Sequence, residues 1–93
     1  MSKLNYLYLI TGMPAVGKST FARQLAKKTN ACLIDIDIAT EELVRAAMNK
    51  LNGSPEDRDS PLFKETFRAP IYDTLFFIAA ENLPHTSVII TGP

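Results

Sequence analysis

Eight consecutive residues near the start of the chain have the types and spacing of a phosphate-binding loop. The segment Gly12-Met13-Pro14-Ala15-Val16-Gly17-Lys18-Ser19 fits the pattern G-x-x-x-x-G-K-[ST] at each fixed position. The glycines allow a tight backbone that turns several N–H groups toward phosphate oxygens. The Lys18 ammonium would reach the β- and γ-phosphates, and the Ser19 hydroxyl would bind Mg²⁺. The predicted nucleotide-binding residues are Gly12, Met13, Pro14, Ala15, Val16, Gly17, Lys18, Ser19 and Thr20.

Two carboxylates follow a second apolar run. Asp35 and Asp37 end the segment Cys32–Asp37, and on a strand residues two apart point to the same face. Beside a triphosphate they could hold Mg²⁺, or accept a proton from an attacking hydroxyl. The alternative is that they only end the strand and polarise the turn after it. We predict Lys18 and Asp37 as catalytic residues, and Ser19, Asp35 and Asp37 as metal ligands.

Two arginines are candidates for binding a substrate anion. Arg58 and Arg68 carry the guanidinium fork that suits phosphate and carboxylate groups. Arg58 lies between Asp57 and Asp59, so a solvated loop is the competing interpretation. The single histidine, His85, excludes a Ser-His-Asp triad and leaves no Cys/His metal-ligand spacing.

The first half of the chain reads as strand, loop, helix and strand. An apolar run predicts a buried strand over Tyr6–Thr11. The next helix should run from the glycine loop to Thr29 and stop at Asn30. Cys32 should be a small core residue at the start of the second strand, Cys32–Asp37. The side chains expected to face the sheet from the first helix are Phe21, Ala22, Leu25 and Ala26.

The second half reads as helices followed by a third strand. Thr40 is the expected N-cap of a helix, and its apolar stripe comprises Leu43, Val44, Ala47, Met48 and Leu51. Ser60 and Pro61 have the types of an N-cap and a first helical residue. The long segment that follows should run to about Leu83, with a kink or break at Pro70. Ile71, Leu75 and Ile78 keep helical spacing along it. Its aromatic side chains, expected to make core or helix contacts, are Phe63, Tyr72, Phe76 and Phe77. The third strand is Ser87–Thr91.

The order β-α-β-α-α-β predicts an α/β fold with a parallel sheet and right-handed crossovers. Its ligand site should lie at the carboxyl ends of the strands. The 93 residues carry 10 basic and 10 acidic side chains, so we expect no nucleic-acid partner and no membrane partner. The single Cys32 favours the reducing cytoplasm.

The chain resembles the small P-loop kinases, which include gluconate kinase, chloramphenicol phosphotransferase and the zeta toxins. Gly12 to Thr20 followed by Leu33 to Asp37 carries the resemblance, and three later segments are similar to bacterial AAA-family ATPases and predicted kinases. These segments are Pro55 to Ser60, Arg68 to Asp73 and Val88 to Pro93. The resemblance implies a three-layer α/β/α P-loop NTPase fold with sheet order 2-3-1-4-5, of which this chain would supply 2-3-1. It also implies ATP and Mg²⁺ as cofactors, and an acid after strand two that acts as base or metal ligand. Asp37 matches that acid best.

Three departures from the family pattern qualify this expectation. Relatives often carry an arginine near Thr40, and the third strand ends in Thr91-Gly92 without a Walker-B aspartate. The family's lid arginines follow its third strand, so residues 1–93 look like the N-terminal part of one such domain.

We therefore expect the ATP–Mg²⁺ part of a kinase that phosphorylates a hydroxyl of a small molecule. The 93-residue chain alone should be inactive, and it should form a homodimer or exchange elements through the exposed edge of strand one. The alternatives are a non-catalytic nucleotide-binding or regulatory fragment, and a zeta-toxin-like kinase of a nucleotide sugar.

Overall fold

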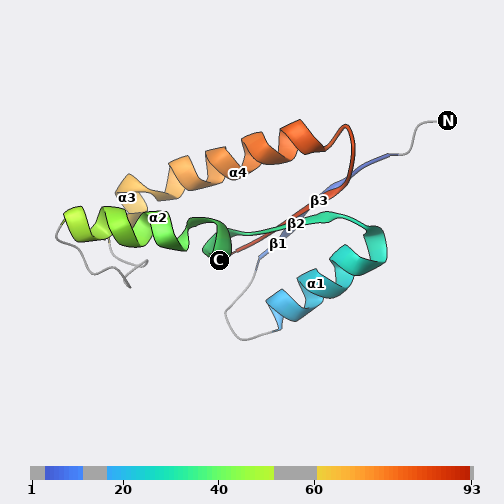
Figure 1. Ribbon diagram of the computed structural model, residues 1–93, viewed down its shortest axis with the longest axis horizontal. Coiled ribbons are helices and arrows are strands. Elements are labelled where there is room, and N and C mark those ends of the chain that lie inside the picture. Colours follow the sequence, from blue (N-terminus) through green and yellow to red (C-terminus); the bar gives the residue numbers. More distant parts are fainter. Residues whose placement is uncertain (1–3, 12–16, 52–60, 93) are drawn as a thin grey trace.

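The computed structural model describes residues 4–11, 17–51 and 61–92 of the chain. Within these ranges the chain forms three strands and four helices (Figure 1). In chain order they are β1 (Leu7–Ile10), α1 (Lys18–Thr29), β2 (Cys32–Asp35), α2 (Ile36–Lys50), α3 (Pro61–Thr66), α4 (Arg68–Asn82) and β3 (Val88–Thr91).

The three strands form one parallel sheet in the order β1-β3-β2. In the middle strand, Val88 is aligned with Leu7 on one side and with Cys32 on the other. All four residues of β3 are buried, as expected of the central strand of a sheet covered on both faces. The predicted α/β fold and the order 2-3-1 are confirmed.

Successive side chains of β3 point to opposite faces of the sheet, so they pack against two different helical layers. Val88 and Ile90 pack with Leu75 and Ala79 of α4 in one buried cluster, which also contains Ile36. Ile89 points to the opposite face, where Figure 1 places α1, and it is fully buried. The result is a three-layer α/β/α arrangement with α1 on one side of the sheet and α2 and α4 on the other.

A second cluster lies away from the sheet, where α2, α3 and α4 meet. Val44 and Met48 of α2 pack with Phe63 of α3, and Phe67 and Ile71 cover them. Figure 1 shows this helical part extending past the strands. The molecule is accordingly long and thin, with extents of 53 × 28 × 17 Å.

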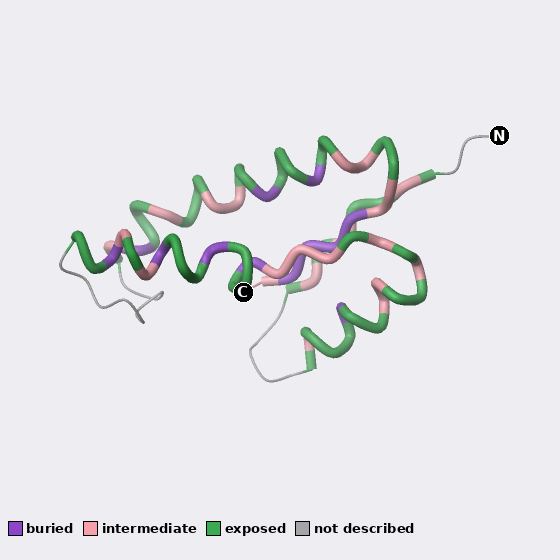
Figure 2. The backbone as a smooth tube through the Cα atoms, in the orientation of Figure 1, coloured by how far each residue is buried: buried purple, intermediate pink, exposed green. Residues whose placement is uncertain are grey.

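Strand β1 is the least covered part of the sheet (Figure 2). Leu7 and Leu9 are aligned with Val88 and Ile90, so they share the face that α4 covers over β3. Leu9 nevertheless remains 56% exposed and Leu7 36% exposed. The α4 layer therefore does not extend over β1.

Helix α1 begins and ends in left-handed backbone. Gly17 before it has φ 79°, and Asn30 after it has φ 56°, which is the conformation that favours Gly and Asn at helix ends. The predicted stop at Asn30 is confirmed. Ala22 is buried as expected, but the expectation that Phe21 faces the sheet is wrong: Phe21 is 56% exposed.

Strand β2 ends two residues earlier than predicted because Asp35 starts a helix. Its Oδ1 accepts hydrogen bonds from the backbone N–H groups of Asp37 (2.9 Å) and Ile38 (3.2 Å), which makes Asp35 the N-cap of α2. Thr40, predicted as the cap, lies inside the helix and is buried. Its hydroxyl donates to the Ile36 carbonyl at 2.7 Å.

The apolar stripe predicted for α2 is only partly buried. Val44 and Met48 lie in the core, whereas Leu43 is 75% exposed and Leu51 is 47% exposed. Cys32 is exposed as well, against the expectation of a core residue, because β2 is an edge strand. The predicted Ser60 cap lies outside the described residues.

The break predicted at Pro70 occurs three residues earlier, at Phe67 between α3 and α4. Proline has no N–H to donate to the carbonyl four residues before it, and its ring clashes with that carbonyl. That carbonyl belongs to Thr66, the last residue of α3. Pro70 itself fits in the first turn of α4, where an N–H is not needed for an intrahelical bond.

Helix α4 is apolar around most of its circumference, but only part of it packs. Leu75 and Ala79 are buried, whereas Phe77 is 72% exposed and Phe76 and Ile78 are also exposed. These last three side chains lie outside the core, because the sheet covers one side of the helix only.

Candidate functional site

The predicted phosphate-binding lysine lies beside the end of the central strand. Lys18 is the first residue of α1, and its Nζ donates a hydrogen bond to the Gly92 carbonyl at 3.0 Å. Gly92 directly follows β3, and its own N–H donates to the Ile10 carbonyl at 3.3 Å. Three elements thus bring their ends together at the carboxyl edge of the sheet, where a parallel α/β fold binds its ligand.

The start of α1 presents backbone donors at the same edge. The first intrahelical bond runs from Phe21 N to the Gly17 carbonyl at 2.9 Å, so the amides of Lys18, Ser19 and Thr20 precede it. Gly17 has no side chain to cap them. The amides of the first turn and the helix dipole favour an anion there. The side chains of Ser19 and Thr20 are exposed. Gly12, Met13, Pro14, Ala15 and Val16 lie outside the described residues.

The two aspartates occupy different positions from those predicted. Asp35 is the last residue of β2 and is aligned with Thr91 in the sheet, and its Oδ1 caps α2. Asp37 lies in the first turn of α2 and is exposed. The expectation that both point to one face of a strand is wrong, because the strand ends between them. Both still lie at the carboxyl edge, on the side of β3 opposite β1.

Gly92 is a site residue whose structural role the sequence did not reveal. A Cβ at this position would lie 2.9 Å from Cγ1 and 3.0 Å from Cβ of Ile36, and closer still to Cδ1. Any other residue would therefore collide with the first residue of α2. The Thr91-Gly92 pair is recognisable in the sequence as a polar end of the third strand, but the neighbour that requires the glycine is 56 residues away.

The end of β3 carries no acid. Thr91 is buried with 3% of its surface exposed, and it occupies the last position of the strand. The Walker-B aspartate that the family pattern has at the end of this strand is therefore replaced here by Thr91. The neighbouring strand β2 ends in Asp35, which is aligned with Thr91, and Asp37 follows two residues later. Among the described residues, these two aspartates are our candidates for carboxylates near the end of β3.

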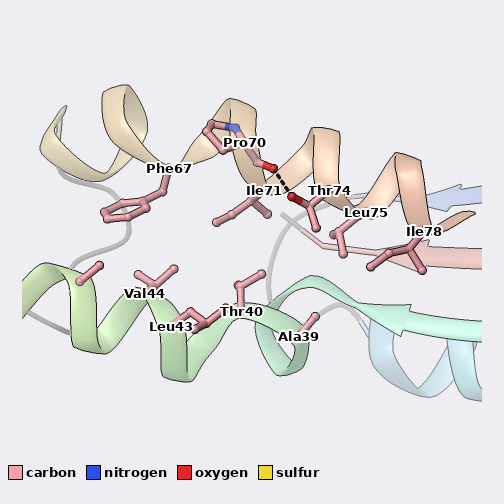
Figure 3. A pocket seen from close by; sticks show the side chains of 11 residues that line it. Ala39, Thr40, Leu43, Val44, Phe67, Pro70, Ile71, Thr74, Leu75 and Ile78 are labelled. Carbon is pink, nitrogen blue, oxygen red and sulfur yellow. Dashed lines mark hydrogen bonds between the residues drawn. The ribbon is translucent and has the colours of Figure 1, made fainter.

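An apolar groove of about 420 Å³ lies between α2 and α4 (Figure 3). Its two polar side chains, Thr40 and Thr74, donate their hydroxyl protons to the carbonyls of Ile36 (2.7 Å) and Pro70 (2.8 Å). The remaining lining consists of Ala39, Leu43, Val44, Ala47, Phe67, Pro70, Ile71, Leu75 and Ile78. The sequence did not predict this groove, because apolar spacing alone does not show which apolar residues border an open surface.

No contact among the described residues brings a predicted substrate-binding arginine to the carboxyl edge of the sheet. Arg68 begins α4 and is exposed, and Arg58 lies outside the described residues. Within residues 4–11, 17–51 and 61–92, no group of three or more His, Cys, Asp or Glu side chains could hold a metal ion. No helix among these residues is both long enough and apolar enough to cross a bilayer.

A parallel sheet whose first strand leads through a glycine-rich loop into a lysine-initiated helix defines the P-loop NTPase class, which binds nucleotides. The chain matches the AAA domain family over residues 7–91 and belongs to that family. Comparison with curated proteins and with solved structures gave no match.

Proposed function

We propose that this chain binds ATP with Mg²⁺ and forms the nucleotide site of a kinase. The kinase would transfer the γ-phosphoryl group to a hydroxyl of a small molecule. The observation that carries the proposal is Lys18, in its G-x-x-x-x-G-K-[ST] motif, at the end of the central strand. Membership of the AAA domain family supports the same assignment.

Each group at the edge would have a separate role. The amides at the start of α1 and the Lys18 ammonium would hold phosphate oxygens. Ser19 would hold Mg²⁺, with Asp37 or the second carboxylate oxygen of Asp35, since the two helix-capping bonds use Oδ1. A bound Mg²⁺ neutralises charge on the β- and γ-phosphates. Asp37 would accept the proton of the attacking hydroxyl.

The groove between α2 and α4 is the candidate binding site for the acceptor. Its first residue, Ala39, lies two residues after Asp37 on the same helix. A molecule in the groove could therefore place a hydroxyl toward the start of α2. Because both threonine hydroxyls already donate to backbone carbonyls, the lining favours an acceptor with an apolar body.

A second candidate function is nucleotide binding without catalysis. Thr91 at the end of β3 favours it, because the strand offers no carboxylate for the metal. Such a protein would bind ATP and transfer nothing. Failure to phosphorylate any hydroxyl compound, with ATP binding intact, would favour this second function.

The single, exposed Cys32 favours a reducing compartment such as the cytoplasm. The zero net charge favours neither nucleic acid nor an acidic membrane as a partner.

Substitution of Lys18 tests the nucleotide site directly. In Lys18→Ala the affinity for ATP–Mg²⁺ should fall by about 1.5–3 kcal/mol, the range for hydrogen bonds to charged groups. Lys28→Ala is the matched control, because Lys28 is an exposed lysine in the last turn of the same helix. Titration calorimetry measures both. Equal affinities of the wild type and Lys18→Ala would contradict the assignment.

A further inference from the structure

Gly92 directly follows β3 and contacts the ends of three other elements. Its N–H bonds to β1 at Ile10, and its carbonyl accepts from Lys18 of α1. Its Cα faces Ile36, the first residue of α2. Gly92 therefore joins the strand before the glycine loop, the helix after it and the helix that carries Asp37.

The contact with Ile36 leaves no space for a side chain at residue 92. Ile36 is only 4% exposed and packs in the core cluster with Leu75 and Val88. It has little room to withdraw, because close-packed cores yield only by shifting their neighbours. A Cβ at residue 92 would push either α2 or the end of β3 out of place.

Either shift would disturb the proposed nucleotide site. Moving the end of β3 displaces the carbonyl that holds the Lys18 ammonium. Moving the first turn of α2 displaces Asp37 and breaks the two bonds by which Asp35 caps the helix. The distance from the Lys18 ammonium to the Asp35 and Asp37 carboxylates thus depends on this close packing of residue 92 against α2.

We propose that Gly92 is a positioning residue for the phosphate site. Its carbonyl holds the Lys18 ammonium at the sheet edge until phosphate oxygens replace it. Its missing side chain lets Ile36, the first residue of α2, pack against the end of β3. This inference rests on the proposed function, because it assigns Gly92 a role in nucleotide binding.

Four variants titrated with ATP–Mg²⁺ by calorimetry test this role. Gly92→Ala should weaken binding by about tenfold, within the range seen for coupled neighbours. Ile36→Ala removes Cδ1 and Cγ1, the two atoms nearest the added Cβ, and should leave the affinity almost unchanged. The double variant Gly92→Ala/Ile36→Ala should then recover most of the lost affinity. Phe63→Leu, in the second core cluster, should lower the melting temperature without changing the affinity.

The outcomes separate this inference from the proposed function. If the wild type binds ATP and Gly92→Ala binds equally well, the role of Gly92 is wrong and the nucleotide site stands. The role is also wrong if the double variant binds no better than Gly92→Ala. If Gly92→Ala alone does not fold, the double variant decides: ATP binding by the folded double variant supports the role, and its absence contradicts it. If the wild type does not bind ATP, both proposals fail.

Discussion

Asp35 and Asp37 are two residues apart, yet the fold uses them differently. The Asp35 carboxylate accepts two backbone hydrogen bonds at the start of α2, whereas the exposed Asp37 lies in the first turn of that helix. The two capping bonds give Asp35 a structural role whatever it binds. We propose Asp37 as the residue with the main chemical role.

The first residue-scale prediction concerns the role of Asp37 in phosphoryl transfer. In the protein as its gene encodes it, Asp37→Asn should lower the turnover number by about 100-fold or more, the range for loss of a general base. The affinity for ATP should change little, because such a group acts mainly in the transition state. Kinetics with radiolabelled ATP measure the first quantity and calorimetry the second.

Asp73→Asn is the matched control, since Asp73 is an exposed aspartate on α4. A turnover number that is the same in Asp37→Asn and the wild type would remove Asp37 from the mechanism.

At the residue scale, the phosphate-loop pattern located Lys18 at the correct edge of the sheet. The pattern succeeds because its glycines and lysine act over consecutive residues. The requirement for glycine at residue 92 could not be predicted, because it arises from Ile36, which only the folded chain brings into contact.

At the scale of elements, the start of α2 depends on the Asp35 cap. Asp35→Ala should lower the free energy of unfolding by about 1 kcal/mol, the usual cost of losing an N-cap. Asp37→Ala should cost less, about 0.3–1 kcal/mol, because an exposed acid in the first turn only complements the helix dipole. Urea denaturation followed by circular dichroism compares the two. Equal losses would show that the capping bonds contribute nothing beyond the charge.

A second prediction at this scale concerns the break between α3 and α4. In Pro70→Ala, residue 70 regains an N–H that can donate to the Thr66 carbonyl. The two helices should then join through Phe67, whose N–H already donates to the Phe63 carbonyl at 2.9 Å. Backbone chemical shifts of residues 66–70 would report the continuous helix.

Pro84→Ala is the control, because Pro84 lies in the turn after α4. An unchanged break in Pro70→Ala would show that packing of Phe67 against the second core cluster, and not the proline, separates the helices.

Element order followed from the sequence and sheet order from the family resemblance, but helix faces and caps followed less well. Apolar periodicity predicts α2 but overestimates its burial, because it cannot show that Leu43 borders an open groove. Thr40 has the residue type of an N-cap, but Asp35 occurs earlier and accepts the amide bonds first. Caps compete locally, and residue type alone does not decide which one forms.

At the scale of the whole molecule, the chain exposes more solvent-accessible surface than a compact monomer of the same mass would. Its accessible surface is 6656 Å² for 10.3 kDa, whereas a compact monomer of that mass exposes about 5400 Å². The difference, roughly 1250 Å² on that scale, exceeds the ~800 Å² that each partner buries in a standard interface. Leu4, Tyr6, Leu7 and Leu9 contribute part of this exposed apolar surface.

We propose that a second copy of the chain covers the β1 edge. The zero net charge leaves no overall repulsion between copies, and an edge strand offers unpaired backbone groups. Light scattering at several concentrations should show a molar mass that rises above the monomer value.

Leu9→Lys should shift this equilibrium toward the monomer, because a charged edge resists strand pairing. Leu43→Lys, at an exposed leucine on α2, should not. A wild-type chain that stays monomeric at every concentration would contradict the proposal.

The central position of β3 also determines the order in which the protein can fold during synthesis. Among the described strands, β1 and β2 pair with β3 and not with each other, and Leu7 can pair only after Val88 has left the ribosome. Such long-range pairing is slow because a long loop must close first. Until residues 88–91 emerge, β1 and β2 lack the strand with which they pair. The nascent chain should therefore be most prone to aggregation, and most dependent on chaperones, just before β3 emerges.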